Sequence, residues 1–101
     1  MTSEISQELI EECDLIRDRR IEIEGVDQAI VALLQQRVRL AREVGRLKSG
    51  TGLPLFDPAR EAAVVRRAAA QARDDGISED GIRQIFWQVI GLCRRAQVGE
   101  S

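Results

Sequence analysis

The chain has 101 residues, which is the size of one domain, so we expect a single domain over residues 1–101. Apolar residues make up 44% of it and charged residues 32%, a balance that is typical of a soluble globular protein and excludes disorder. The formal net charge of −2 argues against a nucleic-acid partner. No apolar run approaches the roughly 18 residues that a membrane span needs, and the acidic start of the chain differs from a signal peptide. We therefore expect a cytoplasmic protein with no membrane association.

Cysteine and histidine usage limits the chemistry. Cys13 and Cys93 lie far apart and form no metal-binding spacing, so we expect buried free thiols and neither a disulfide nor a zinc site. The chain has no histidine and no tyrosine, which removes the commonest general base and a common general acid. We predict no metal and no cofactor, and a function that depends on carboxylates, on cations, or on binding and positioning.

Two breaks divide the chain into helical segments. The first is the glycine- and proline-rich segment 50–57, where Asp57 is placed to cap a helix that begins at Pro58. The second lies where Gly76 can close one helix and Ser78 can cap the next. These breaks predict an all-α fold of three helices at about 6–49, 58–74 and 78–98, joined first by loop 50–57. A helix–turn–helix split near Gly25 is the alternative for the first segment.

The first predicted helix carries an unusual stripe. At 1.5 Å per residue it would be about 60 Å long, too long to be covered by two shorter helices of its own chain, so a partner subunit is the expected cover. Its apolar stripe, at alternating spacings of four and three, is interrupted by Arg20, Asp27, Arg37 and Lys48. Because burying unpaired charge is unfavourable, three cations with one carboxylate predict either acidic side chains from other helices or an anionic ligand.

The other two helices add polar groups near this stripe. Arg60 and Glu61 stand on the first turn of the second helix, close to the loop that follows Lys48. The third helix has an apolar face that includes Cys93 and continues to Gln97. Each has an ordinary structural explanation when taken alone: a carboxylate is favoured at a helix N-terminus, and a glutamine at the end of an apolar stripe is usually half-exposed.

Three sequence blocks resemble the all-α class of chorismate mutases. They are Arg37-x-x-Leu40-Ala41-x-Glu43-Val44-Gly45-x-x-Lys48, then Gly52-Leu53-Pro54-x-x-Asp57-Pro58-x-Arg60-Glu61, and Ile85-Phe86 followed by Cys93-Arg94-x-x-Gln97. The resemblance covers about residues 16–98, and the block from Lys48 to Glu61 is its most specific part. It implies an intertwined helical homodimer whose long first helices pair. It also implies the rearrangement of chorismate to prephenate on the way to phenylalanine and tyrosine.

The resemblance also implies roles for individual residues. Arg20 would reach in from the other subunit to a site that one subunit forms with Arg37, Lys48, Asp57, Arg60, Glu61, Cys93 and Gln97. Arg20 and Arg37 match the arginines that hold the two carboxylates of the substrate. Lys48 and Gln97 match the donors to its ether oxygen, and Glu61 matches the acceptor for its ring hydroxyl. Some relatives have serine at the position of Cys93, and because a thiol is the weaker donor, a direct substrate contact is left open there.

This chemistry agrees with the composition. A pericyclic rearrangement needs no proton transfer and no nucleophile, so the absence of histidine is no obstacle. The substrate dianion must be held in a compact shape, and arginines can hold it by its carboxylates. Hydrogen-bond donors must also stand where negative charge builds on the ether oxygen. Lys48 is the one lysine among 15 basic residues. The codon bias of a GC-rich genome would explain the arginine excess but not the one lysine, for which a role as a compact ammonium donor offers a functional reason.

Three alternatives remain open at this stage. Two are enzymes of the same fold, an isochorismate-pyruvate lyase and a mutase for the 4-amino analogue of chorismate, and the Glu61 carboxylate favours a hydroxyl substrate over these. The third is a regulatory or scaffolding helical dimer, which would need no buried cations. We expect no feedback inhibition within this chain, because no segment forms an amino-acid-sensing domain. The sequence does not decide whether the protein associates with another shikimate-pathway enzyme.

Overall fold

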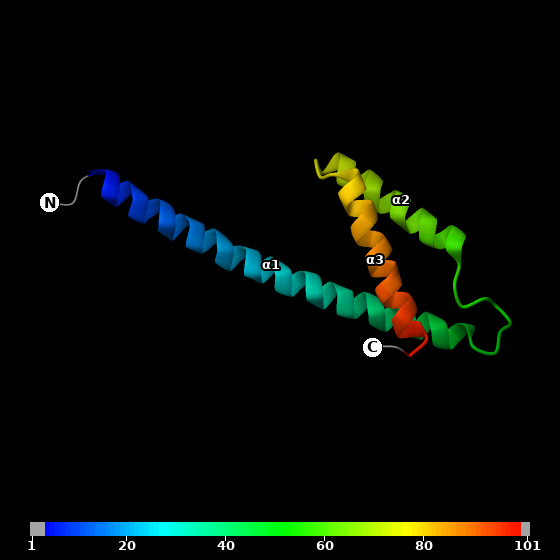
Figure 1. Ribbon diagram of the computed structural model, residues 1–101. Helices are drawn as coiled ribbons and strands as arrows, with labels where there is room; N and C mark the ends of the chain where they lie inside the picture. The colour runs from blue at the N-terminus through cyan, green and yellow to red at the C-terminus, as the bar shows by residue number, and fades with distance from the viewer. Residues whose placement is uncertain (1–3, 100–101) are drawn as a thin grey trace. The chain divides into compact units, whose positions relative to one another are not determined.

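The computed structural model describes residues 4–99, apart from the side chain of Ile5, and those residues form three α-helices and no strand. The helices are α1 (Glu4–Lys48), α2 (Pro58–Asp74) and α3 (Glu79–Gln97) (Figure 1). The predicted all-α class with three helices is confirmed. Helix α1 continues through Gly25, so the alternative of a split at that residue is wrong. The ends of the predicted domain, residues 1–3 and 100–101, lie outside the described residues.

The chain divides into two compact units, Met1–Leu33 and Leu34–Ser101. In the first unit the apolar stripe of α1 is open to solvent: Leu9, Ile16, Ile23 and Ile30 are each between 49% and 57% exposed. Cys13 is also exposed and carries a free thiol, so the predicted burial of this cysteine is wrong for a single chain. It lies on a face of α1 that no other helix of its own unit covers.

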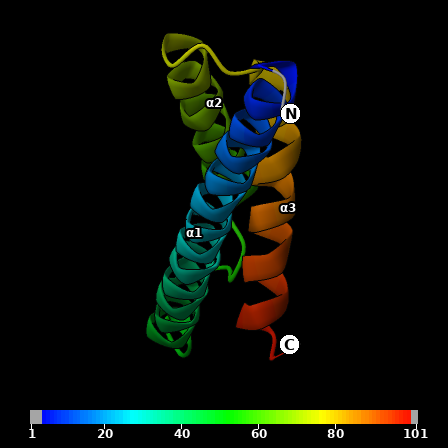
Figure 2. The ribbon, with the colours of Figure 1, turned by 90° about the vertical axis from the view of Figure 1, so that its left-hand side faces the viewer.

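The second unit contains the end of α1 together with α2 and α3, which pack against each other. Figure 2 shows α2 running toward the short turn that joins the two helices and α3 running back from it. The core of the unit consists of Val65, Ala69 and Ala72 on α2 and Ile90, Cys93 and Ala96 on α3. Burial of the Cys93 thiol agrees with the prediction. Ile85 is 55% exposed, because the buried face of α3 is centred on Ile90, Cys93 and Ala96.

The turn between α2 and α3 follows the predicted capping. Gly76 has φ 74°, a left-handed conformation that glycine adopts without steric cost. The amide of Ile77 donates to the carbonyl of Ala72 at 2.8 Å, and the amide of Gly76 donates to the carbonyl of Arg73 at 3.2 Å. These two bonds make a Schellman motif that satisfies the last carbonyls of α2. Ser78 caps α3 by accepting a bond from the Gly81 amide at 3.1 Å.

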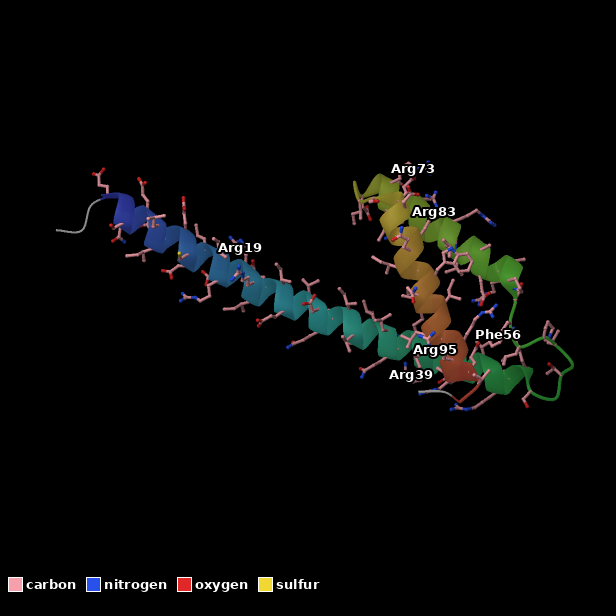
Figure 3. All side chains as sticks on the ribbon, viewed as in Figure 1. Arg19, Arg39, Phe56, Arg73, Arg83 and Arg95 are labelled. Carbon is pink, nitrogen blue, oxygen red and sulfur yellow. The ribbon has the colours of Figure 1, made fainter. Side chains whose placement is uncertain are left out.

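Ion pairs on the surface contribute little to this fold. Arg73 pairs with Glu79, and Arg83 with Asp80 at 2.7 Å, beside the α2–α3 turn (Figure 3). Exposed pairs of this kind are each worth about 0–1 kcal/mol. The packing of α2 against α3 therefore depends mainly on the buried apolar residues of these two helices and on their caps. Among the described residues, no helix is both long and apolar enough to cross a membrane.

Candidate active site

A cavity of about 240 Å³ lies within the second unit and is lined by side chains from all three helices. Its polar lining combines three arginines with a glutamate, a cysteine and a glutamine: Arg37 from α1, Arg60 and Glu61 from α2, and Cys93, Arg94 and Gln97 from α3. Its apolar lining is Leu40, Ala41, Val44, Val64 and Ile90. All of these polar residues except Arg94 were assigned to one site in the sequence analysis.

Helical spacing explains why these side chains meet. On α1, Arg37, Ala41 and Val44 follow the spacing of four and three residues that keeps side chains on one face of a helix. On α3, Cys93 and Gln97 are four residues apart and share a face in the same way. Two hydrogen bonds join these faces, from Arg37 to the Cys93 Sγ and from Gln97 to the Ala41 carbonyl, and residues of both faces line the cavity.

Arg37 is anchored by the buried thiol of Cys93. Its Nη1 donates to the Cys93 Sγ at 2.9 Å, and Cys93 is 5% exposed. This bond uses one N–H of a guanidinium that has several, so the remaining edge of the planar group is available to a carboxylate. In this structure Cys93 acts as an acceptor that orients Arg37.

Glu61 is held by Arg94 across the α2–α3 contact. The Nε and Nη2 of Arg94 donate to Oε2 and Oε1 of Glu61, both at 2.6 Å, which is a bidentate pair. Hydrogen bonding from Arg94 holds the pKa of Glu61 below its ordinary value. Because the folded-state pKa is lowered, the stability that the pair contributes is present above the ordinary carboxyl pKa and is lost as pH falls through the lowered value.

Arg94 is the site residue that the sequence analysis missed. Its guanidinium lies 4.3 Å from the centre of the Phe56 ring, where the loop enters α2 (Figure 3), so one arginine contacts both the carboxylate and an aromatic face. The available signal was its spacing: Arg94 precedes Gln97 by one helical turn, which places both on the side of α3 that faces the cavity.

Lys48 lies in a neighbouring cavity of about 450 Å³, which is lined by Gly45, Lys48, Ser49, Gly50, Gly52, Leu53, Leu55 and Gln97. Its Nζ donates to the carbonyl of Leu55 at 3.3 Å. Gln97 lines both cavities, and its Nε2 donates to the carbonyl of Ala41 at 2.9 Å. The two predicted ether-oxygen donors are therefore neighbours, with Gln97 at the boundary between the two spaces.

Asp57 and Arg20 line neither of these cavities. The Oδ1 of Asp57 accepts a hydrogen bond from the Arg60 amide at 3.1 Å, so its carboxylate caps α2 and sets the position of the first turn, which carries Arg60 and Glu61. Arg20 belongs to the first unit, where its side chain is exposed.

The charge of the main cavity suits a dianion. Three arginines and one glutamate give the lining a net charge of +2. Glu61 is the only carboxylate that the described residues bring into this lining, and it is already paired with Arg94. Arg37 and Arg60 therefore account for the positive charge that this pair does not neutralise. Among the described residues, no group of three or more cysteine, aspartate and glutamate side chains is arranged to hold a metal ion.

Comparison with known families agrees with this geometry. The sequence model of chorismate mutase type II matches residues 19–98, which include the lining of both cavities. The chain belongs to this family.

Individual relatives of this chorismate mutase family member differ in length and in name. A 3-dehydroquinate dehydratase of Pyrobaculum aerophilum is 36% identical over 75% of this chain and 22% of its own length. A 4-amino-4-deoxychorismate mutase of Streptomyces venezuelae is 30% identical over 74% of each protein. A chorismate mutase of Methanocaldococcus jannaschii is 30% identical over 66% of this chain and 68% of its own length.

The chain spans about a fifth of the longer curated relatives that it matches, between 19% and 22% of their length. The matched part of those proteins is therefore one segment of a larger chain. No solved structure gives a significant match to this chorismate mutase family member.

Proposed function

We propose that this chain is a chorismate mutase, which rearranges chorismate to prephenate in the biosynthesis of phenylalanine and tyrosine. The observation that carries the proposal is the main cavity, where guanidinium groups from three helices surround a single paired carboxylate with a net charge of +2. Chorismate is a dianion, so this charge matches it. Membership of the chorismate mutase type II family supports the same activity.

In the proposed mechanism, Arg37 holds one carboxylate of the substrate. Its guanidinium is fixed by the Cys93 Sγ, and a fixed planar donor loses little entropy when it binds a carboxylate. Holding both carboxylates brings the reacting carbons together, and orientation of this kind lowers the barrier without proton transfer. Glu61, ionised beside Arg94, accepts a hydrogen bond from the ring hydroxyl.

Gln97 and Lys48 stabilise the ether oxygen as its bond to carbon breaks. An oxygen placed beside Gln97 in the main cavity lies at the boundary with the cavity of Lys48. The long stem of Lys48 can rotate its ammonium from the Leu55 carbonyl to that oxygen, since the existing bond at 3.3 Å is weak. Donors aimed at developing charge stabilise the transition state more than the substrate.

We further propose that the enzyme is a homodimer. The exposed apolar stripe of the first unit includes Leu9, Ile16 and Ile23, and pairing with the same stripe of a second copy would remove it from water. Arg20 interrupts this stripe, which supports its proposed role in the partner's site, where it would hold the second carboxylate. From its biosynthetic role we place the enzyme in the cytoplasm.

One competing function has specific support. The Streptomyces venezuelae relative is named as a mutase of 4-amino-4-deoxychorismate, and this chain matches 74% of its length. That substrate carries an amino group where chorismate has its ring hydroxyl. A carboxylate neutralised by Arg94, as Glu61 is here, suits a neutral hydroxyl donor better than a charged ammonium.

The test of the proposed function is an assay with purified protein. We expect the absorbance of chorismate to disappear and prephenate to be the product. Formation of pyruvate in a parallel assay supplied with isochorismate would identify the lyase. Absence of any turnover, with the protein folded and dimeric, would favour the scaffolding role.

Gln97 gives a prediction about pH. An amide donates at all ordinary pH values, so activity of the unmodified protein should vary little through neutrality. Gln97→Glu should be active only in acid, because the carboxyl group donates only when it is protonated. Recovery should be partial, since its single proton is shared between the Ala41 carbonyl and the substrate. A Gln97→Glu variant as active at pH 8 as at pH 5 would remove Gln97 from the ether-oxygen contact.

Cys93 gives a prediction about anchoring. We expect Cys93→Ser to keep kcat/KM within a few-fold, because a hydroxyl can still accept the hydrogen bond from Arg37. Cys93→Ala should lose more, because it removes the acceptor that orients Arg37. Steady-state kinetics, with circular dichroism as a check on folding, measures this. A hundred-fold loss in folded Cys93→Ser, which keeps an acceptor for Arg37, would mean that the sulfur position contacts the substrate.

A further inference from the structure

Arg94 has no contact with the substrate in the proposed mechanism, where it acts only through Glu61. It lines the cavity, binds both oxygens of Glu61 at 2.6 Å and lies over the Phe56 ring at 4.3 Å. The Glu61 side chain is 16% exposed and that of Arg94 is 38% exposed. The carboxylate is therefore the more buried member of the pair.

This arrangement fixes the charge that a ligand meets at Glu61. Each carboxylate oxygen gives one lone pair to Arg94 and keeps another, so Glu61 can still accept a hydrogen bond from a bound molecule. However, the pair as a whole is neutral. A neutral hydroxyl donor loses little binding energy when the pair is neutral. An ammonium group is instead repelled by the nearby guanidinium, which has the same charge.

We propose that Arg94 is a positioning residue that neutralises Glu61 and makes the cavity select a ring hydroxyl over a ring ammonium. The inference rests on the proposed function, because it assumes that Glu61 faces the substituted ring position of a chorismate-like substrate. It adds to that function a residue that determines specificity through another side chain. Chorismate and 4-amino-4-deoxychorismate share both carboxylates and differ at this ring position, so they are the matched pair of substrates that isolates the effect.

The test compares kcat/KM for the two substrates in the same preparation. In Arg94→Gln the Glu61 carboxylate keeps its full negative charge, and we expect the preference for chorismate over the amino substrate to fall by at least about ten-fold. Arg94→Lys keeps the positive charge and should keep the preference within about three-fold of wild type. The ratio is unaffected by partial misfolding, because both substrates are turned over by the same folded fraction.

Two controls locate the effect. Arg95 lies on α3 (Figure 3), where it is exposed, and it lines neither cavity, so Arg95→Gln should leave the preference unchanged. In a Glu61→Gln background, Arg94→Gln should no longer change the preference, since the carboxylate charge that Arg94 neutralises is then absent.

Each remaining outcome is distinct. If Arg94→Gln lowers kcat/KM equally for both substrates, Arg94 acts on the carboxylates that both substrates share or on the packing, and the inference is overturned. Chorismate turnover by the wild type would still support the proposed function. If the wild type converts the amino substrate and not chorismate, or converts neither, the proposed function and the inference both fail.

Discussion

Lys48→Ala should lower kcat by at least about a hundred-fold while the protein remains folded. A donor aimed at an oxygen on which charge develops contributes about 3–4 kcal/mol to the transition state, and Lys48 is the charged member of the proposed donor pair. The structure explains why folding should survive: Lys48 lies in the last turn of α1, and its Nζ makes a bond of 3.3 Å to the Leu55 carbonyl. Steady-state kinetics and thermal unfolding measure the two quantities separately.

Lys48→Arg should lose most of kcat as well. A guanidinium is longer and planar, so it would place its donors beyond the position where the ammonium stands, and a misplacement of about 1 Å costs about a hundred-fold. Arg46→Lys is the matched control, because Arg46 is exposed in the same helical turn and lines neither cavity. Near-normal turnover by Lys48→Arg would contradict the proposed role of a compact point charge.

The helices were predictable because their ends carry local signals. Asp57, Gly76 and Ser78 each act on backbone groups within a few residues, so the sequence alone contains both partners of each capping bond. Helical spacing placed Arg37 and Lys48 on one stripe of α1, but the two residues line different cavities, so spacing alone did not predict the membership of the main cavity. The exposure of Cys13 was not predictable from one chain, because burial of that face depends on what covers it.

The arrangement within the cavity was less predictable. The pair between Glu61 and Arg94 joins residues 33 positions apart, and the bond from Arg37 to Cys93 spans 56. Such contacts depend on how two helices cross and on which rotamer each long side chain adopts, and neither is encoded in local spacing. The bond from Lys48 to the Leu55 carbonyl depends in the same way on the path of the loop.

Mixed dimers of Arg20→Ala and Lys48→Ala chains should recover activity that neither variant has alone. If Arg20 serves the partner's site and Lys48 its own, each homodimer lacks one essential group in both sites and should be nearly inactive. In a mixed dimer one site carries both substitutions and the other site carries neither. Random pairing makes half of the dimers mixed, so unfolding and refolding an equal mixture should restore at most about a quarter of wild-type activity.

The result distinguishes a shared site from one built within a single chain. If Arg20 and Lys48 served the same subunit's site, every chain in the mixture would carry a defective site, and no pairing could repair it. Differently tagged chains purified through both tags give verified mixed dimers, in which a shared site predicts about half of wild-type activity, since one of the two sites is intact. Persistent inactivity of those purified mixed dimers would rule out a site completed by Arg20 of the partner subunit, whereas recovery would require both a homodimer and a substrate held from two chains.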